Sequence, residues 1–207
     1  MWISSEKVVQ IQVDKIEPLE VHLIFYEDIS YPLKTTRIVL TGAPATGKTT
    51  VSQALEELGH QVFHEQAREI ISDSLEKGSD VLPWKDLMGF TDVVWNLRNE
   101  QYDSALLGTK SFYDRTVLDS YAYLLKGNVA PLDRWVKDMN ERRFDKIFLL
   151  PVWPEIHALD SERMETLEDC MKVEKFIIDA YEEIGYELVV VPKIPVKERV
   201  AFILDRL

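Results

Sequence analysis

The stretch TGAPATGKTT, residues 41–50, follows directly on the short apolar run RIVL at residues 37–40. That run predicts a buried β-strand, and residues 48–58 predict a helix that ends before Gly59. Between them lies the pattern Gly-x-x-x-x-Gly-Lys-Thr, residues 42–49. The two glycines allow the loop to curl so that successive backbone N–H groups point inward.

A curled loop in this position is typical of a site for the phosphates of ATP, because the helix that follows adds free N–H donors and partial positive charge. We expect Lys48 to reach the β- and γ-phosphates and the Thr49 hydroxyl to bind Mg²⁺. The alternative is a turn that holds nothing, with Thr46 and Thr50 acting only as polar residues of the helix start. The order of strand, loop and helix favours nucleotide binding. The expected nucleotide-binding residues are Gly42, Ala43, Pro44, Ala45, Thr46, Gly47, Lys48, Thr49 and Thr50.

Composition limits the remaining possibilities. The chain has 207 residues, 46% of them hydrophobic, a formal net charge of −12 and a single cysteine. An acidic surface repels nucleic acid and anionic membranes, so neither is an expected partner. One cysteine cannot form an intrachain disulfide, the first twenty residues lack a signal-peptide core, and no apolar run approaches the length of a membrane span. We therefore expect a cytoplasmic protein, and a homodimer is compatible with the sequence.

Two segments of different character make up the chain. Residues 1–36 are β-rich and are expected to form an extension ahead of the main domain, residues 37–207. The main domain alternates strands with helices, one of which is expected to begin near Pro83. Five apolar strands separated by helices predict an α/β fold with a mainly parallel sheet between two helical layers. The expected strands are RIVLT, HQVFH, KSFYD, KIFLL and YELVVVP.

Charged residues follow two of these strands, where ligands collect in open parallel sheets. Glu65 follows the second strand and can act as a base or anchor for an acceptor hydroxyl, or simply as an acid at a helix start. Asp114 and Arg115 end the third strand. Arg115 can bind a transferred phosphate, or the two residues can form an ordinary turn that caps the next helix.

The fourth strand, KIFLLP, has no terminal acid, so the usual Walker B pattern is missing there. Asp114 is therefore the candidate, by elimination, for the acid that helps to hold Mg²⁺. The polar segment after that strand is long enough to cover the site and contains Arg163. Arg163 can stabilise charge on a transferring phosphoryl group, or it can pair with Glu162 or Glu165 at the surface.

Residues 37–207 resemble the NadR-type AAA ATPase/kinase domain family, relatives of ribosylnicotinamide kinases and, more distantly, of deoxynucleoside kinases. The resemblance rests on LTGAPATGKTT, EQAREII, FYDRTVLDSYAYL, ERMETLEDCMKVE and YEEIGYELVVVP, in that order. It implies a P-loop NTPase fold of the nucleotide-kinase type, with the Asp-Arg strand beside the phosphate-loop strand. It also implies that Glu65 is the base and that Arg115 is the arginine that follows an acid. Thr116 departs from the serine or histidine usual after that arginine.

Two functions remain open from the sequence. The first is a Mg²⁺-dependent kinase that transfers the γ-phosphoryl group of ATP to a hydroxyl of a small, nucleoside-like acceptor. Lys48, Glu65, Asp114, Arg115 and Arg163 would carry that reaction. The second is an ATP-hydrolysing switch that binds a protein partner through its N-terminal strands.

Overall fold

The computed structural model describes residues 34–156 and 166–207. The expected extension, residues 1–36, lies almost wholly outside these ranges, so its boundary with the main domain stays a prediction. Arg163 also lies outside the described residues.

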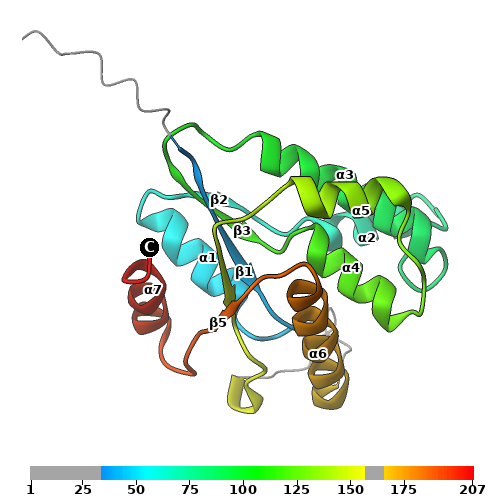
Figure 1. Cartoon of the computed structure of the whole chain (residues 1–207). Coiled ribbons are helices and arrows are strands. Elements are labelled where there is room, and N and C mark those ends of the chain that lie inside the picture. The colour runs from blue at the N-terminus through cyan, green and yellow to red at the C-terminus, as the bar shows by residue number, and fades with distance from the viewer. Residues whose placement is uncertain (1–33, 157–165) are drawn as a thin grey trace, which may run out of the picture. The chain divides into compact units, whose positions relative to one another are not determined.

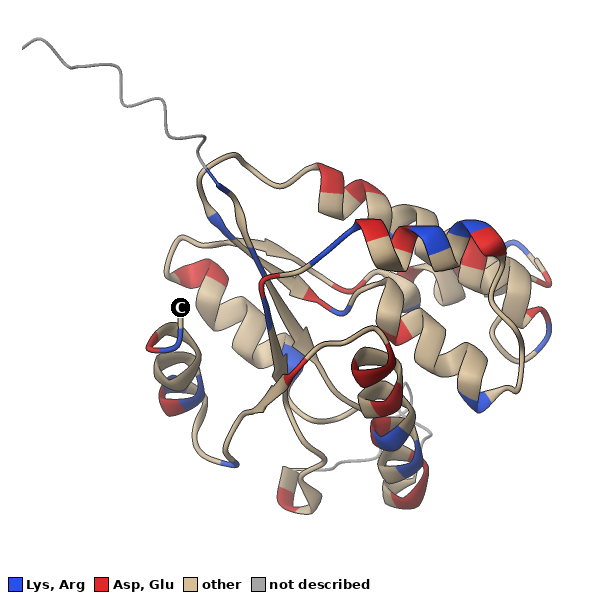
Figure 2. Cartoon of the chain, viewed as in Figure 1, with Lys and Arg blue, Asp and Glu red and all other residues tan. Residues whose placement is uncertain are grey.

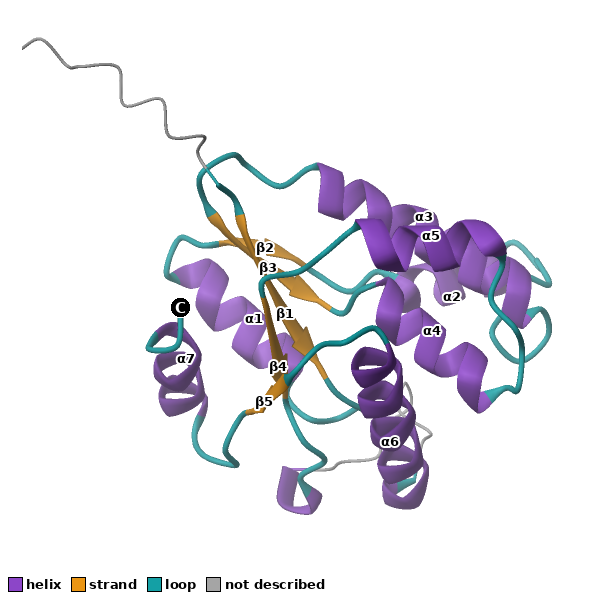
Figure 3. Ribbon diagram, viewed as in Figure 1, coloured by secondary structure: helices purple, strands orange, loops and turns teal. Residues whose placement is uncertain are grey.

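The centre of the structure is a five-stranded sheet in the order β2-β3-β1-β4-β5 (Figure 3). Every neighbouring pair of strands is parallel, as the sequence predicts. The central strand β1 lies between β3 and β4, and its residues Ile38, Val39 and Leu40 are fully buried. The strands are β1 Thr36–Thr41, β2 Gln61–Phe63, β3 Lys110–Asp114, β4 Lys146–Leu149 and β5 Leu188–Val190.

Helices cover both faces of this sheet, which gives the expected three layers (Figure 1). Successive side chains of a strand point to opposite faces. Ile38 and Leu40 accordingly pack with α1 and α7, whereas Val39 packs with α4 and α6. The helices are α1 Lys48–Glu57, α2 Ala67–Glu76, α3 Leu87–Asp103, α4 Val117–Lys126, α5 Asp133–Glu141, α6 Leu167–Glu183 and α7 Val196–Leu204.

The expected start of the long helix α3 is wrong by four residues. Pro83 lies in the preceding turn, where the backbone N–H groups of Lys85 and Asp86 both donate to the carbonyl of Leu82. The helix begins after Asp86, whose Oδ1 accepts from the N–H of Gly89 at 2.9 Å. An aspartate cap satisfies a free N–H of the first turn, so it sets the helix start here in place of the proline.

Charged residues of both signs occur along α5 and α6 (Figure 2). Within residues 34–156 and 166–207, we find no helix with the length and apolar character that crossing a bilayer requires.

Two tryptophans stack in the core on the α4–α6 side of the sheet. The ring centroids of Trp95 and Trp135 are 5.0 Å apart with an interplanar angle of 21°. Both side chains are buried, so Trp135→Ala removes a large apolar volume. We expect this change to lower the free energy of unfolding by about 3–5 kcal/mol, measured by urea denaturation.

Trp84→Ala is the matched control, because Trp84 is 63% exposed. Its effect should stay within about 0.5 kcal/mol. Equal losses of unfolding free energy in Trp135→Ala and Trp84→Ala would contradict this account of the core.

Candidate active site

The loop between β1 and α1 has the tight curl that the sequence predicts. Gly42 has a φ of 140°, and a Cβ there would lie 2.3 Å from the carbonyl oxygen of Leu150, which follows β4. Gly47, which precedes α1, has a φ of 82°. Ala45 has a φ of 60°. All three φ values are positive, and glycine adopts such a backbone without strain. The loop therefore depends on glycine at position 42, where a Cβ would collide, and at position 47, where a Cβ would strain the backbone.

The ammonium group of Lys48 lies inside the curl. Its Nζ donates to the carbonyls of Gly42 at 2.8 Å and Ala43 at 2.7 Å. Burial, helped by the neighbouring Arg115, lowers the pKa of Lys48 to about 8, against the opposing effect of nearby acids. The group is therefore mainly charged at neutral pH and lies against the loop that would hold phosphate.

Arg115 joins the ends of three neighbouring strands. It has a φ of 74° directly after β3, and its N–H donates to the carbonyl of Leu40 in β1. Its Nε lies 3.0 Å from Oε1 of Glu65, which follows β2. Burial opposes the charge of Arg115, but the surrounding acids, Glu65 above all, outweigh it and hold the pKa of Arg115 well above its usual value.

Glu65 is ionised in this setting. Burial raises its pKa, but the charges of Arg115, Arg98 and Lys48 outweigh burial and lower it to about 2. Glu65 and Arg115, which follow β2 and β3, therefore form an ion pair at the carboxyl ends of the strands.

A further carboxylate, Asp119 in the first turn of α4, organises this site and was missed by the sequence analysis. It is fully buried, and its Oδ1 accepts from the Thr41 hydroxyl at 2.6 Å. Its Oδ2 accepts from the Tyr181 hydroxyl at 2.7 Å and from the N–H of Thr116 at 2.9 Å. Arg115 Nη1 lies 3.3 Å from Oδ1. The capping box T-x-x-D at residues 116–119 is the sequence signal that points to it.

Asp114 ends β3 beside Leu40, with which it pairs in the sheet. It is 3% exposed, and among the described residues its Oδ1 has no hydrogen-bond partner. Burial raises its pKa, as does Glu65, while Lys48 opposes the rise. A buried carboxylate oxygen without a partner is a suitable ligand for a hard cation such as Mg²⁺. Thr49 is exposed in the first turn of α1.

A cavity of about 340 Å³ opens beside these groups. Pro44 of the loop lines it together with Glu65 and Arg115. The other walls are mainly apolar and aromatic and come largely from α2, α3 and the turn between them. A volume of this size suits a small-molecule ligand. The wall residues are Ala67, Arg68, Ile71, Pro83, Trp84, Leu87, Phe90, Thr91, Val94, Arg98, Ser120 and Tyr123.

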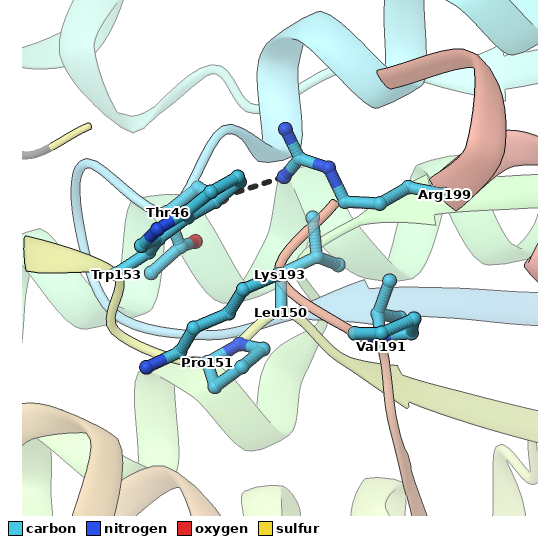
Figure 4. Close-up of a pocket in the computed structure, with 8 residues that line it drawn as sticks. Thr46, Leu150, Pro151, Trp153, Val191, Lys193 and Arg199 are labelled. Atoms are coloured by element: carbon cyan, nitrogen blue, oxygen red, sulfur yellow. Dashed lines mark hydrogen bonds between the residues drawn. The ribbon is translucent and has the colours of Figure 1, made fainter. Parts of the chain in front are cut away.

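A small hollow lies against Thr46 of the loop (Figure 4). Thr46 lines it together with Trp153, Lys193 and Arg199, which come from the segments after β4 and β5 and from α7. Arg199 donates to the carbonyl of Thr46 at 3.1 Å. No sequence pattern pointed to Arg199, because 153 positions separate the two residues.

A family profile described as an AAA domain matches residues 37–199. This chain belongs to the AAA domain family. The match spans most of the chain and includes every site residue described above. A search of curated proteins found no significant match.

Solved structures show the same fold in proteins of low sequence identity. A deoxyadenosine kinase from M. mycoides, solved with dCMP and dCDP, is 19% identical with a TM-score of 0.59, covering 83% of this chain and 97% of the kinase. A NadR protein in complex with NR is also 19% identical, with a TM-score of 0.60, and the match covers 83% of this chain and 49% of NadR. A YorR protein from Bacillus subtilis, solved with phosphorylated GDP, is 15% identical with a TM-score of 0.55, over 83% of this chain and 95% of YorR. The AAA domain of this chain therefore has the P-loop fold that these three proteins share.

This AAA domain brings most of the predicted site residues to one edge of its sheet. Lys48, Glu65, Asp114 and Arg115 interact electrostatically with one another there. Thr46 is buried, its hydroxyl donating to the carbonyl of Ala43 at 3.1 Å, and Thr50 is exposed beside Thr49. The roles assigned to these residues stay predictions.

The low pKa of Glu65 implies a pH-dependent contribution to stability. A pKa of about 2 in the folded state against 4.5 in the unfolded state stabilises the fold above pH 4.5 and is lost as the pH falls toward 2. We expect Glu65→Gln to lower the free energy of unfolding at pH 7 by roughly 3 kcal/mol. The gap between variant and wild type should narrow as the pH falls from 5 to about 3, measured by urea denaturation.

Glu69→Gln is the control, because Glu69 lies exposed in the first turn of α2. A difference in unfolding free energy between Glu65→Gln and wild type that stays constant over this pH range would contradict the ion pair.

Proposed function

We propose that this protein is a Mg²⁺-dependent kinase that transfers the γ-phosphoryl group of ATP to a hydroxyl of a small, nucleoside-like acceptor. One observation carries the proposal: Pro44 of the loop lines the same cavity as Glu65 and Arg115. A molecule in that cavity would therefore lie directly beside the phosphates held by the loop. Proximity of acceptor and donor is the main requirement of phosphoryl transfer.

The loop and Lys48 would bind the donor. Backbone N–H groups of residues 42–47 and the start of α1 provide the donors, and the ammonium group of Lys48 moves from the loop carbonyls to the β- and γ-phosphate oxygens. Thr49 and Asp114, whose Oδ1 has no hydrogen-bond partner in the part of the chain that the structure describes, fit Mg²⁺, which neutralises charge on those phosphate oxygens when bound.

Glu65 and Arg115 would act on the acceptor side. The Glu65 carboxylate accepts a hydrogen bond from the acceptor hydroxyl and so aims its oxygen at the γ-phosphorus. The new oxygen–phosphorus bond forms as the bond from the γ-phosphorus to the bridging oxygen breaks and ADP leaves. With a pKa of about 2, Glu65 is a weak base, so it accepts the hydroxyl proton late and passes it to solvent.

Arg115 would neutralise the charge that spreads over the transferring group. We assign the same role to Arg163, which lies outside the described residues. Asp119 keeps Arg115 in place and touches no reacting atom.

The cavity walls support a flat, weakly polar acceptor. Trp84, Phe90 and Tyr123 contribute aromatic surface to these walls. The neighbours of shared fold that were solved with nucleotides or with NR support the same class.

The direct test is to incubate the protein with ATP and Mg²⁺, with and without a panel of nucleosides and ribosylnicotinamide. ADP and phosphorylated acceptor are measured together. The proposal expects ADP to rise only when an acceptor is present, in equal amount with its phosphorylated form. ADP release that ignores every acceptor and responds to a protein partner would contradict the kinase and favour an ATP-hydrolysing switch.

Lys48→Ala should abolish ATP turnover, because it removes the charge that faces the β- and γ-phosphates. ADP formation measures the effect. Lys197→Ala, at an exposed lysine of α7, should leave turnover unchanged. A folded Lys48→Ala protein with normal turnover would exclude this role for Lys48.

Glu65→Gln should leave ATP affinity unchanged and slow transfer to the acceptor by about 100-fold or more, because the amide cannot accept the proton. Single-turnover kinetics and ATP calorimetry, at a temperature where the variant is folded, separate the two steps. Equal losses in binding and transfer would point to a purely structural role for Glu65.

A further inference from the structure

Arg199 of α7 is a buried cation that no carboxylate neutralises among the described residues. Its side chain is 5% exposed, and its Nε has no hydrogen-bond partner within residues 34–156 and 166–207. A buried guanidinium without an acid is costly to a fold, so its contacts are a reason to look for a function.

The contacts of Arg199 place its guanidinium against the loop, on the side that faces α7 (Figure 4). Nη1 donates to the carbonyl of Thr46 at 3.1 Å. A Cβ at Gly47 would lie 3.0 Å from the same Nη1, so the guanidinium packs closely against this glycine. On another side, the Arg199 Cζ lies 5.3 Å from the ring centroid of Trp153. The group is thus held between the loop and an aromatic ring.

The carbonyl of Thr46 and the N–H of Gly47 are the two ends of one peptide plane. A trans peptide points them in opposite directions, and none of the described peptide bonds is cis. Arg199 holds the carbonyl toward α7, and the N–H of Gly47 therefore points away from α7. The same contact draws electron density toward the carbonyl and makes that N–H a stronger donor.

We propose that Arg199 is a positioning residue for the nucleotide: it fixes the Thr46–Gly47 peptide so that the Gly47 N–H faces the bound triphosphate. The inference rests on the proposed binding of ATP by the loop. Because no described acid neutralises the guanidinium, its charge adds to the attraction for phosphate in a protein whose net charge is −12. Arg199 needs no contact with the nucleotide for this role.

The test measures affinity for ATP and for inorganic tripolyphosphate, each with Mg²⁺, in wild type and in Arg199→Ala. We expect Arg199→Ala to weaken both by about tenfold or more, since it removes a charged hydrogen bond that orients the loop. Tripolyphosphate has no base and no ribose. An equal loss of affinity for tripolyphosphate and for ATP therefore shows that Arg199 acts on the loop and not on the rest of ATP. Low concentrations of guanidinium chloride should restore part of the affinity of Arg199→Ala, and sodium chloride at equal ionic strength should not.

Arg206→Ala is the matched control, because the Arg206 side chain follows the same helix and donates to the carbonyl of Phe202 rather than to the loop. It should bind both ligands like wild type. If Arg199→Ala does not fold, Arg199→Lys takes its place: it keeps the charge, loses the fork geometry and should weaken both ligands about threefold.

Failure of the wild type to bind ATP would overturn the proposed function. Wild-type binding with unchanged affinities in a folded Arg199 variant would overturn this inference alone. A lower affinity for ATP with an unchanged affinity for tripolyphosphate would also overturn this inference, because Arg199 would then act on the base or ribose.

Discussion

The site depends on one close approach between two backbones. The loop after β1 passes so near the end of β4 that only a glycine fits at position 42, against the carbonyl of Leu150. This contact sets the direction in which the loop curls, and Lys48 fills the curl by donating to two of its carbonyls. The same contact positions part of the cavity wall, because Pro44 of this loop lines the cavity.

Buried charge is the second constraint. Arg115 lies between Glu65 and Asp119, and Asp119 in turn accepts hydrogen bonds from Thr41 and Tyr181. These residues come from the ends of β1, β2 and β3 and from α4 and α6, so five elements meet at one set of ion pairs and hydrogen bonds. Removing one member of such a network is costly, and a complete network is rigid, which suits the proposed transfer between two bound molecules.

The sequence predicted the strands, their parallel arrangement and the loop, because each depends on residues close together in the chain. It also placed Glu65 and Arg115 at the same edge, since carboxyl ends of parallel strands converge. It did not reveal Asp119 or Arg199, whose partners Thr41 and Thr46 lie 78 and 153 positions away. The start of α3 was misplaced because Pro83 and Asp86 are competing start signals, and the aspartate cap decides the outcome.

The central claim is that the curled loop and Lys48 bind the triphosphate of ATP together with Mg²⁺. Isothermal titration calorimetry of the wild-type protein with ATP at millimolar Mg²⁺ tests it most directly, with AMP as the matched ligand that lacks the two outer phosphates. The account predicts one ATP per chain and much weaker binding of AMP. Absence of binding by both ATP and GTP, or equal affinity for ATP and AMP, would contradict it.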